Sequence, residues 1–410
     1  MMNTEKNKSA TCEGNNITIA QPLKSGWLPA FAVTSCWFGT HVGGGFASGN
    51  QVVSFFSQYG PAAVIFPLLA MGLLAIVMWI ITMFAKVNGF ENYKDTFAAL
   101  YPHPKMEIFF EIFYLIIVFA AVAAAVAGAG NVLANMLGVN YDLMFNKLLF
   151  NLLITAILIV LTIFGVKLVI AASTVLSVAI ILISVTMIIV GLSVDFNGIS
   201  AQVMAHYNIA DLTAYTHDPA KSIIRGIFVY AAFQALSIPA VVAASQDLSF
   251  KGVKRFAVLG GVLNGCVLAG SVAMLAKWYP LLAALNGMED FGNTLSIPNQ
   301  TVLGIIGMKW LTALFSLLCF CAFISTCVTL VYTLTQGFQV FFFPKKIKSE
   351  KVRSVFTGGI IIGLCFAISL MGLSAIVTLL YGYDGYYAIF AVIIPAFIWG
   401  IPKLRKSLRE

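Results

Sequence analysis

Five glycines near the start of the chain are spaced so that they could open a helix and expose its backbone. They lie within eleven positions: Gly39, Gly43, Gly44, Gly45 and Gly49. Each glycine costs about 1 kcal/mol of helix propensity relative to alanine, so the run predicts an unwound stretch. Freed N–H groups in such a stretch can bind a carboxylate, and freed carbonyl oxygens can coordinate a cation. Gly43 and Ala47 also have the spacing of small residues in a tight helix–helix contact, which is the alternative interpretation.

A histidine lies inside this glycine run. His41 could contact a ligand or carry a proton, since its charge changes within the physiological pH range. Ionisable groups are rare in strongly apolar segments, which favours such a role. A hydrogen-bonded structural histidine is the alternative.

A second polar interruption is predicted in a later apolar segment, at Gln234-Ala-Leu-Ser-Ile-Pro239. Gln234 can both donate and accept hydrogen bonds, and Ser237 lies within its reach along the chain. Three aromatic residues are expected to flank the two interruptions if their helices pass beside them: Tyr114, Tyr230 and Phe233. Packing is the alternative role for these aromatics, because Phe alone occurs 33 times.

The elements that must position these residues are membrane-spanning helices. The chain has 410 residues, of which 60% are hydrophobic and 10% charged, whereas soluble domains carry about 25% charged residues. Soluble enzymes, nucleic-acid-binding domains and secreted disulfide scaffolds are therefore excluded. No catalytic Ser/His/Asp or HExxH arrangement is found, so no enzymatic activity is expected.

Ten apolar segments are long enough to cross a membrane. They cover approximately residues 27–56, 62–86, 108–136, 146–164, 167–194, 222–247, 255–277, 301–341, 355–373 and 383–401. We expect an all-α membrane protein of two five-helix repeats, and repeats with an odd number of helices must be inverted. The repeats are expected at 27–194 and 222–401, separated by an external loop at 195–221, with tails at 1–26 and 402–410. Interrupted segments at corresponding positions of two repeats indicate a transporter binding site.

The basic residues predict the orientation. Nineteen of the 24 Lys and Arg residues fall on one side if the N-terminus is internal, so both termini are expected in the cytoplasm. These charges face anionic lipid, and no nucleic-acid partner is expected. Arg225 and Asp384 are expected near the external face, either as a pair across a vestibule or as separate solvated charges. No Asp or Glu is expected at mid-membrane near the interruptions, so a cationic substrate would lack a counter-ion and a zwitterion or small neutral solute is favoured.

The first helix resembles a known family. Val42-Gly-Gly-Gly-Phe-Ala-Ser-Gly-Asn-Gln51, followed by Phe55-Phe56 and Tyr59-Gly60, is similar to the first-helix signature of YkvI-type bacterial membrane proteins. Phe228-Val-Tyr-Ala-Ala-Phe-Gln234 resembles the sixth helix of that family, and the helix order is similar over most of the chain. Asn50-Gln51 stands where the family has Gln-Glu, so its acidic residue is absent. The resemblance implies the amino acid–polyamine–organocation superfamily, a LeuT-like fold with helices 1 and 6 broken, and a bacterial cytoplasmic membrane.

A more distant similarity links the same break to sodium-coupled amino acid symporters. Their substrate carboxylate is held by amides that correspond to Gly44 and Gly45. One of their cation sites implies the carbonyls of Gly39 and Val42, with paired hydroxyls on helix 8 for which Ser325 and Thr326 are candidates. Their other sodium site requires an Asn where this chain has Phe46, so only one sodium ion is expected.

The sequence therefore predicts a secondary active transporter of a small amino acid or related zwitterion, driven by sodium or protons through alternating access. The alternative is a membrane protein that does not transport, namely a sensor or an ion channel. The substrate is expected to bind at His41, Gly43, Gly44, Gly45, Tyr114, Tyr230, Phe233, Gln234 and Ser237. No cofactor is expected apart from sodium, and the oligomeric state is not predicted.

The orientation can be tested at the basic stretch Lys345–Arg353. Five positive charges in nine residues strongly resist translocation. With the native cysteines replaced, Ser349→Cys should resist impermeant thiol reagents in intact cells and react after permeabilisation. Asp211→Cys, in the predicted external loop, is the control that should label in intact cells. External labelling of Ser349→Cys would contradict the predicted orientation or number of spans.

Overall fold

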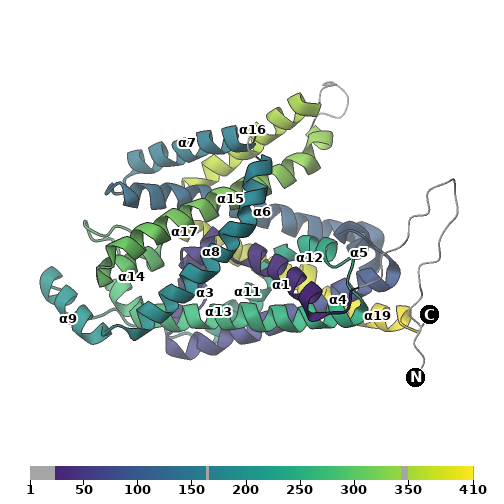
Figure 1. The fold of residues 1–410 in the computed structure, drawn as a ribbon, viewed down its shortest axis with the longest axis horizontal. Coiled ribbons are helices and arrows are strands. Elements are labelled where there is room, and N and C mark those ends of the chain that lie inside the picture. The colour runs from purple at the N-terminus through teal and green to yellow at the C-terminus, as the bar shows by residue number, and fades with distance from the viewer. Residues whose placement is uncertain (1–23, 163–165, 343–349, 410) are drawn as a thin grey trace.

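The computed structural model describes residues 24–162, 166–342 and 350–409, and these are almost entirely helical (Figure 1). The α-helices are α1 (Trp27–His41), α2 (Gly44–Ala47), α3 (Asn50–Phe55), α4 (Phe66–Asn88), α5 (Tyr93–Leu100), α6 (Ile108–Met136), α7 (Met144–Val160), α8 (Val166–Ser193), α9 (Phe196–Tyr207), α10 (Pro219–Ile223), α11 (Tyr230–Phe233), α12 (Ile238–Ala244), α13 (Phe250–Leu285), α14 (Pro298–Ile306), α15 (Lys309–Phe342), α16 (Glu350–Ser369), α17 (Leu373–Ala375), α18 (Gly382–Ala388) and α19 (Ile401–Ser407). Tighter 3-10 turns are η1 (Ser57–Tyr59), η2 (Pro61–Ile65), η3 (Pro104–Glu107) and η6 (Gln234–Ser237), and wider π-helical turns are η5 (Ile224–Val229), η7 (Ile376–Tyr381), η8 (Ile389–Ile393) and η9 (Ala396–Gly400).

Long helices from distant parts of the chain lie side by side. Helix α13 runs along α4 and also packs on α1, while α15 packs on α6 and α8. Helices α7 and α16 lie together along one edge of the bundle (Figure 1). Helices α9 and α14 lie at one end of the bundle, whereas α5 and α19 lie at the other. The short helices α1 and α2 therefore sit between long helices contributed by both halves of the sequence.

The predicted break in helix 1 is confirmed. Helix α1 ends at His41, and the backbone is extended at Gly43 (φ −74°, ψ 179°) before α2 begins. A second interruption follows at Gly49, whose φ of 87° is a left-handed conformation that strains any residue with a Cβ. The glycine run thus divides the first span into three short helical pieces.

Helix 6 is interrupted differently from the expectation. Residues Pro219–Ala244 form one span, in which the backbone tightens into the 3-10 turn η6 without unwinding. Pro239 lies in the first turn of α12, where its missing N–H removes no hydrogen bond. The change from π to α to 3-10 hydrogen bonding takes the place of an extended break.

Two expected spans have different bounds. The segment 301–341 is divided at Gly307, whose φ of 81° ends α14 before α15 begins. The last span starts at Leu373 and continues to Ser407, so it begins ten residues before the expected start at 383. The sequence leaves two possibilities for Tyr381-Gly-Tyr-Asp-Gly-Tyr-Tyr387, a short connection or part of a longer helix, and the structure shows the helix. Gly372, with a φ of 84°, separates this span from α16.

The described residues include six helices long and apolar enough to cross a membrane, or seven if α8 and α9 form one span. These two helices meet at an angle of 80°, so the expected external loop at 195–221 contains helix α9. The structure is that of a multi-pass membrane protein. Its division into repeats at the expected boundaries stays a prediction.

The turn at Gly307 can be tested against a neighbouring glycine. An added Cβ meets no atom within 4 Å at either Gly307 or Gly304, but only Gly307 has a positive φ. Gly307→Ala should therefore destabilise the protein by about 1 kcal/mol through backbone strain. Gly304→Ala, inside α14, should stabilise it by about 0.5–1 kcal/mol. Thermal unfolding in detergent measures both, and equal effects would contradict the assigned break.

Candidate functional site

The break in helix 1 leaves backbone groups without partners. Among the described residues, the N–H groups of Gly43, Gly44 and Gly45 donate to no acceptor. The carbonyl oxygens of Gly39 and Val42 likewise accept no hydrogen bond in this part of the chain. Unsatisfied backbone at membrane depth is tolerated only where it is buried in protein or lines a cavity. These groups therefore mark a place where a ligand can complete the hydrogen bonding.

An aromatic ring from α15 fills the space beside this break. A Cβ on Gly44 or on Gly128 would overlap the ring of Phe323, so the ring lies between α2 and α6. The side chain of Phe323 is fully buried. Both glycines are required because only a residue without a side chain lets the two backbones approach the ring this closely.

A chain of buried polar side chains runs from the break into helix 6. His41 Nδ1 lies 2.6 Å from Asn264 Oδ1, and His41 Nε2 lies 3.0 Å from the Tyr230 hydroxyl. Gln234 Nε2 lies 3.4 Å from the same hydroxyl and 3.5 Å from Gln51 Oε1. All five side chains are buried. The structure thus brings His41, Tyr230 and Gln234 together, as the sequence predicts.

The direction of these hydrogen bonds follows from Asn264. Its amide nitrogen donates to the carbonyl of Gly260 at 2.8 Å, so its oxygen faces His41 and must accept. The neutral imidazole then carries its hydrogen on Nδ1 and accepts at Nε2 from the Tyr230 hydroxyl. Because Gln234 donates through Nε2, its Oε1 is left buried without a partner among the described residues. The buried hydroxyl of Ser237 also has no partner there.

Hydrogen bonds and an ion pair join elements at the two ends of this region. At one end, Asn299, the second residue of α14, donates from its backbone N–H to Ser48 O at 3.2 Å and from Nδ2 to Ala47 O at 2.9 Å. At the other end, Lys24 forms an ion pair with Asp247 at 3.4 Å and backbone hydrogen bonds with the 247–249 turn. These contacts join α14 to the second helical piece and the start of α1 to the turn after α12.

The fold can now be compared with solved structures. A sodium-coupled sialic acid symporter in its substrate-bound outward-open state superposes with a TM-score of 0.52 at 14% identity, covering 94% of this chain and 89% of that one. MhsT in complex with L-phenylalanine superposes with a TM-score of 0.55 at 15% identity, covering 95% of this chain and 97% of that one. The chain has the fold of these symporters. No family model and no curated protein matches its sequence, so the similarity to YkvI-type proteins stays a prediction.

The expected sodium ligands are partly brought together. Thr326 Oγ1 lies 3.7 Å from the position that a Cβ on Gly43 would take, which places it beside the break. Ser325 donates its hydroxyl hydrogen to the carbonyl of Ala322 at 3.1 Å, the common arrangement for serine in a membrane helix. Its oxygen lone pairs stay available. The oxygens of Gly39, Val42, Ser325 and Thr326 are the donor type that a hard cation prefers.

The structure does not bring Tyr114 to the break. Tyr114 packs against Tyr93 and Phe110 near the start of α6. Gly128, which contacts the ring beside the break, lies fourteen residues further on, or about 21 Å along the helix. Phe233 does lie beside the polar chain, but its neighbours are the aromatic rings of Phe55, Tyr230 and Tyr381. It acts there as a packing residue.

Three residues around the break have little or no signal in the sequence. Asn264 is a single polar residue in an apolar segment, which predicts an interhelical hydrogen bond, and Gln51 belongs to the polar stretch Ser48-Gly-Asn-Gln51. Gln51 Nε2 lies 2.6 Å from where a Cβ on Gly45 would be, so it reaches the break directly. Phe323 is one phenylalanine among 33, and nothing distinguishes it before the fold is known.

The expected placement of Asp384 is wrong. Asp384 is 3% exposed, and both of its carboxylate oxygens lack a partner among the described residues. Arg225 donates instead to Thr378 O at 3.3 Å and lies over the Phe55 ring at 5.1 Å. The two residues are thus neither an ion pair nor separate solvated charges, because the last helix begins earlier and places Asp384 inside the bundle.

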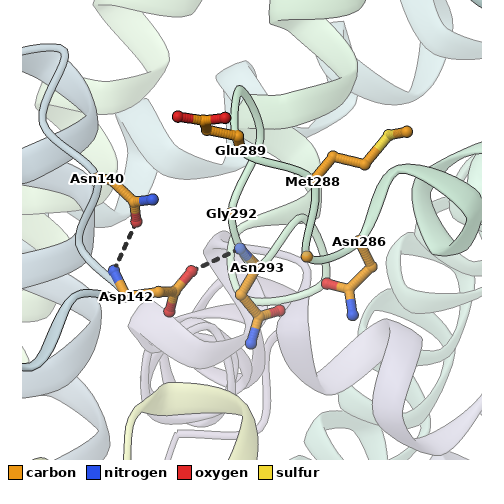
Figure 2. Close-up of a pocket in the computed structure, with 8 residues that line it drawn as sticks. Asn140, Asp142, Asn286, Met288, Glu289, Gly292 and Asn293 are labelled. Carbon is orange, nitrogen blue, oxygen red and sulfur yellow. Dashed lines mark hydrogen bonds between the residues drawn. The ribbon is translucent and has the colours of Figure 1, made fainter. Parts of the chain in front are cut away.

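A separate polar pocket lies at the end of the bundle near α14. It has a volume of about 280 Å³ between the α6–α7 connection and the turn after α13 (Figure 2). Asp142 accepts there from the backbone N–H of Asn293 at 2.6 Å and donates from its own N–H to Asn140. None of the predicted site residues lines this pocket. The pocket lies between two loops and is distinct from the break.

The fit of the ring between the two glycines can be tested by overpacking. Gly44→Ala and Gly128→Ala should each destabilise the protein by about 1–3 kcal/mol, because the ring has to move. Gly72→Ala in α4 is the matched control, since an added Cβ there meets nothing within 4 Å. Combining either change with Phe323→Ala should be non-additive, with a coupling of about 0.5–3 kcal/mol in thermal unfolding. Additive effects would contradict the contact.

Proposed function

We propose that this protein is a secondary active transporter that binds a small amino acid or related zwitterion at the break in helix 1. The observation that carries the proposal is the unpaired backbone of Gly43–Gly45 beside the unpaired oxygen of Gln234. N–H groups are donors and suit a carboxylate, whereas the amide oxygen is an acceptor and suits an ammonium group. The two kinds of group match the two ends of a zwitterion.

The side chain of Gln51 links these two binding groups. It reaches the backbone at Gly45 and lies 3.5 Å from Gln234. A ligand at the break would displace part of this contact and replace its hydrogen bonds. His41, hydrogen-bonded through both ring nitrogens, fixes Tyr230 and thereby the orientation of Gln234. In the proposed site, His41 and Tyr230 act by positioning Gln234.

A sodium ion is proposed as the coupling ion on the donor set of Gly39, Val42, Ser325 and Thr326. Two of these residues lie on α1 and at its end, and two lie on α15. A bound cation would tie these two helices together and supply positive charge beside the carboxylate of the substrate. The similarity in fold to two symporters, one of them described as sodium-coupled, supports this proposal.

The similarity in fold to two symporters supports transport by alternating access. An ion channel, the alternative from the sequence, is less well supported because Phe323 fills the space between α2 and α6.

We also propose that the protein lies in the bacterial cytoplasmic membrane with both termini inside, and that it is a member of the YkvI-type family.

Uptake by proteoliposomes tests the proposal. Radiolabelled alanine, serine, leucine and phenylalanine are offered with sodium or with choline outside. The wild type should accumulate at least one of them with sodium, and Gly44→Leu should abolish this uptake because its side chain displaces the Phe323 ring and disturbs the backbone of the break.

The sodium ligands are tested in the same assay with Ser325→Ala/Thr326→Ala. The double variant should lose sodium stimulation or require much more sodium. Thr333→Ala is the matched control, because Thr333 is an exposed residue of α15 whose hydroxyl also bonds to its own helix. Uptake that ignores sodium in the wild type would contradict the sodium site. Normal uptake by Gly44→Leu would contradict the substrate site.

A further inference from the structure

Asp384 is an acidic side chain within the membrane-spanning part of the protein. It lies in α18, six residues or about 9 Å from the middle of the span Leu373–Ser407. Because half the apolar thickness of a bilayer is about 15 Å, Asp384 is at membrane depth. Only 3% of the residue is exposed, and neither carboxylate oxygen has a hydrogen-bond partner among the described residues.

The elements around α18 offer Asp384 no counter-charge. Helix α18 packs against α6, η5, α11, η7 and η8. The ionisable residues of these elements are Glu111, Tyr114, Arg225, Tyr230 and Tyr381, and the other ionisable residues of α18 itself are Tyr383, Tyr386 and Tyr387. The two ion pairs found among the described residues are Lys24–Asp247 and Lys94–Glu111, so no cation pairs with Asp384 there.

The two polar groups nearest to Asp384 do not bond to it. Tyr387 donates its hydroxyl hydrogen to Phe109 O at 3.1 Å. Arg225 lies beside Gly382, with Nη2 3.5 Å from where a Cβ on Gly382 would be, and donates from Nη2 to Thr378 O. Its Nε has no partner among the described residues, and the guanidinium forms no ion pair with the carboxylate there.

An ionised carboxylate in such a place is very unfavourable. Burying an unpaired charge in an apolar environment costs far more than protonating the group, so the group becomes neutral instead. Acidic residues within membrane spans commonly mark ion or proton pathways. We propose that Asp384 is a proton-binding site whose proton is taken up and released during the transport cycle.

The position of Asp384 connects it to the candidate substrate site. Val229 lies 2.6 Å from where a Cβ on Gly385 would be, and Tyr381 packs on Phe233 with ring centroids 5.3 Å apart. Helix α18 therefore contacts the part of helix 6 that carries Tyr230 and Gln234. When the carboxyl group of Asp384 is neutral, it can stay buried in this water-free contact between α18 and helix 6. Loss of the proton requires α18 to move toward water or toward Arg225.

The step conserves atoms and charge. A proton from one solution forms an O–H bond on Asp384, and the same bond breaks when the proton leaves to the other solution. No oxidant or further reactant is involved. This role rests on the proposed function, because proton movement drives transport only if the protein carries a substrate.

Infrared spectroscopy of the purified full-length protein tests the proton itself, without any substrate. At neutral pH the wild type should show the C=O stretch of a protonated carboxyl group that Asp384→Asn lacks. Asp384→Glu keeps a carboxyl group and should retain a shifted band, which covers the case that the Asn variant folds poorly. Asp211→Asn, an exposed residue, is the control that should leave the band unchanged. Identical spectra for wild type and Asp384→Asn would overturn the proposal.

Proteoliposomes test the coupling with radiolabelled alanine as the probe. Exchange of internal for external alanine should persist in Asp384→Asn, while accumulation driven by an imposed pH gradient should be lost. Retained pH-driven accumulation in that variant would overturn the coupling role. If the wild type carries none of the amino acids tested, the proposed function fails, and the infrared result still decides whether Asp384 holds a proton.

Discussion

The structure depends on one constraint: a polypeptide that unwinds at membrane depth must find partners for its backbone. The glycines of helix 1 unwind it at Val42–Gly43. Surrounding elements supply hydrogen-bond partners for some of the freed backbone groups and not for others. Asn299 of α14 bonds to carbonyls of the second helical piece, and Asn50 donates to the carbonyl of Leu295. Within the described ranges, the amides of Gly43–Gly45 are left without such a partner.

Buried polar side chains are treated in two contrasting ways. The chain from Gln234 through Tyr230 and His41 to Asn264 has a defined direction, since each group donates to the next acceptor. Such a network is rigid because reversing one bond leaves another group unpaired. Asp384 has no partner of this kind among the described residues, so no hydrogen bond there fixes its protonation state. In the proposed transporter, substrate binding therefore depends on helix 6, which carries Gln234, and proton binding depends on α18, which carries Asp384.

Much of the architecture could be predicted because hydrophobic length and glycine spacing are local properties. The break at Gly43 follows from five clustered glycines, and most spans follow from apolar segments of sufficient length. Helix 6 was harder, because Pro239 is compatible with the first turn of a helix and does not by itself unwind the chain. The division at Gly307 depends on one left-handed residue inside an apolar run.

The candidate site could be predicted where its residues lie at an interruption that the sequence itself indicates. His41 and the glycines lie in the first interruption, and Tyr230 and Gln234 lie at the second, whereas Tyr114 lies near the start of its helix, away from the break. Phe323 and Asp384 depend on which helices meet, and this is a long-range property. Asp384 also required the start of the last span, which Tyr381-Gly-Tyr-Asp-Gly-Tyr-Tyr387 obscures because its polar and glycine residues are typical of a connection.

The ring held between Gly44 and Gly128 has an evolutionary consequence. Three residues on three helices share one volume, so neither glycine can gain a side chain while the ring remains. A descendant that gains a side chain at either glycine must first, or at the same time, lose the ring. Residues linked in this way diverge together and leave few tolerated intermediates, so related proteins can share this arrangement of helices and still differ completely at all three positions.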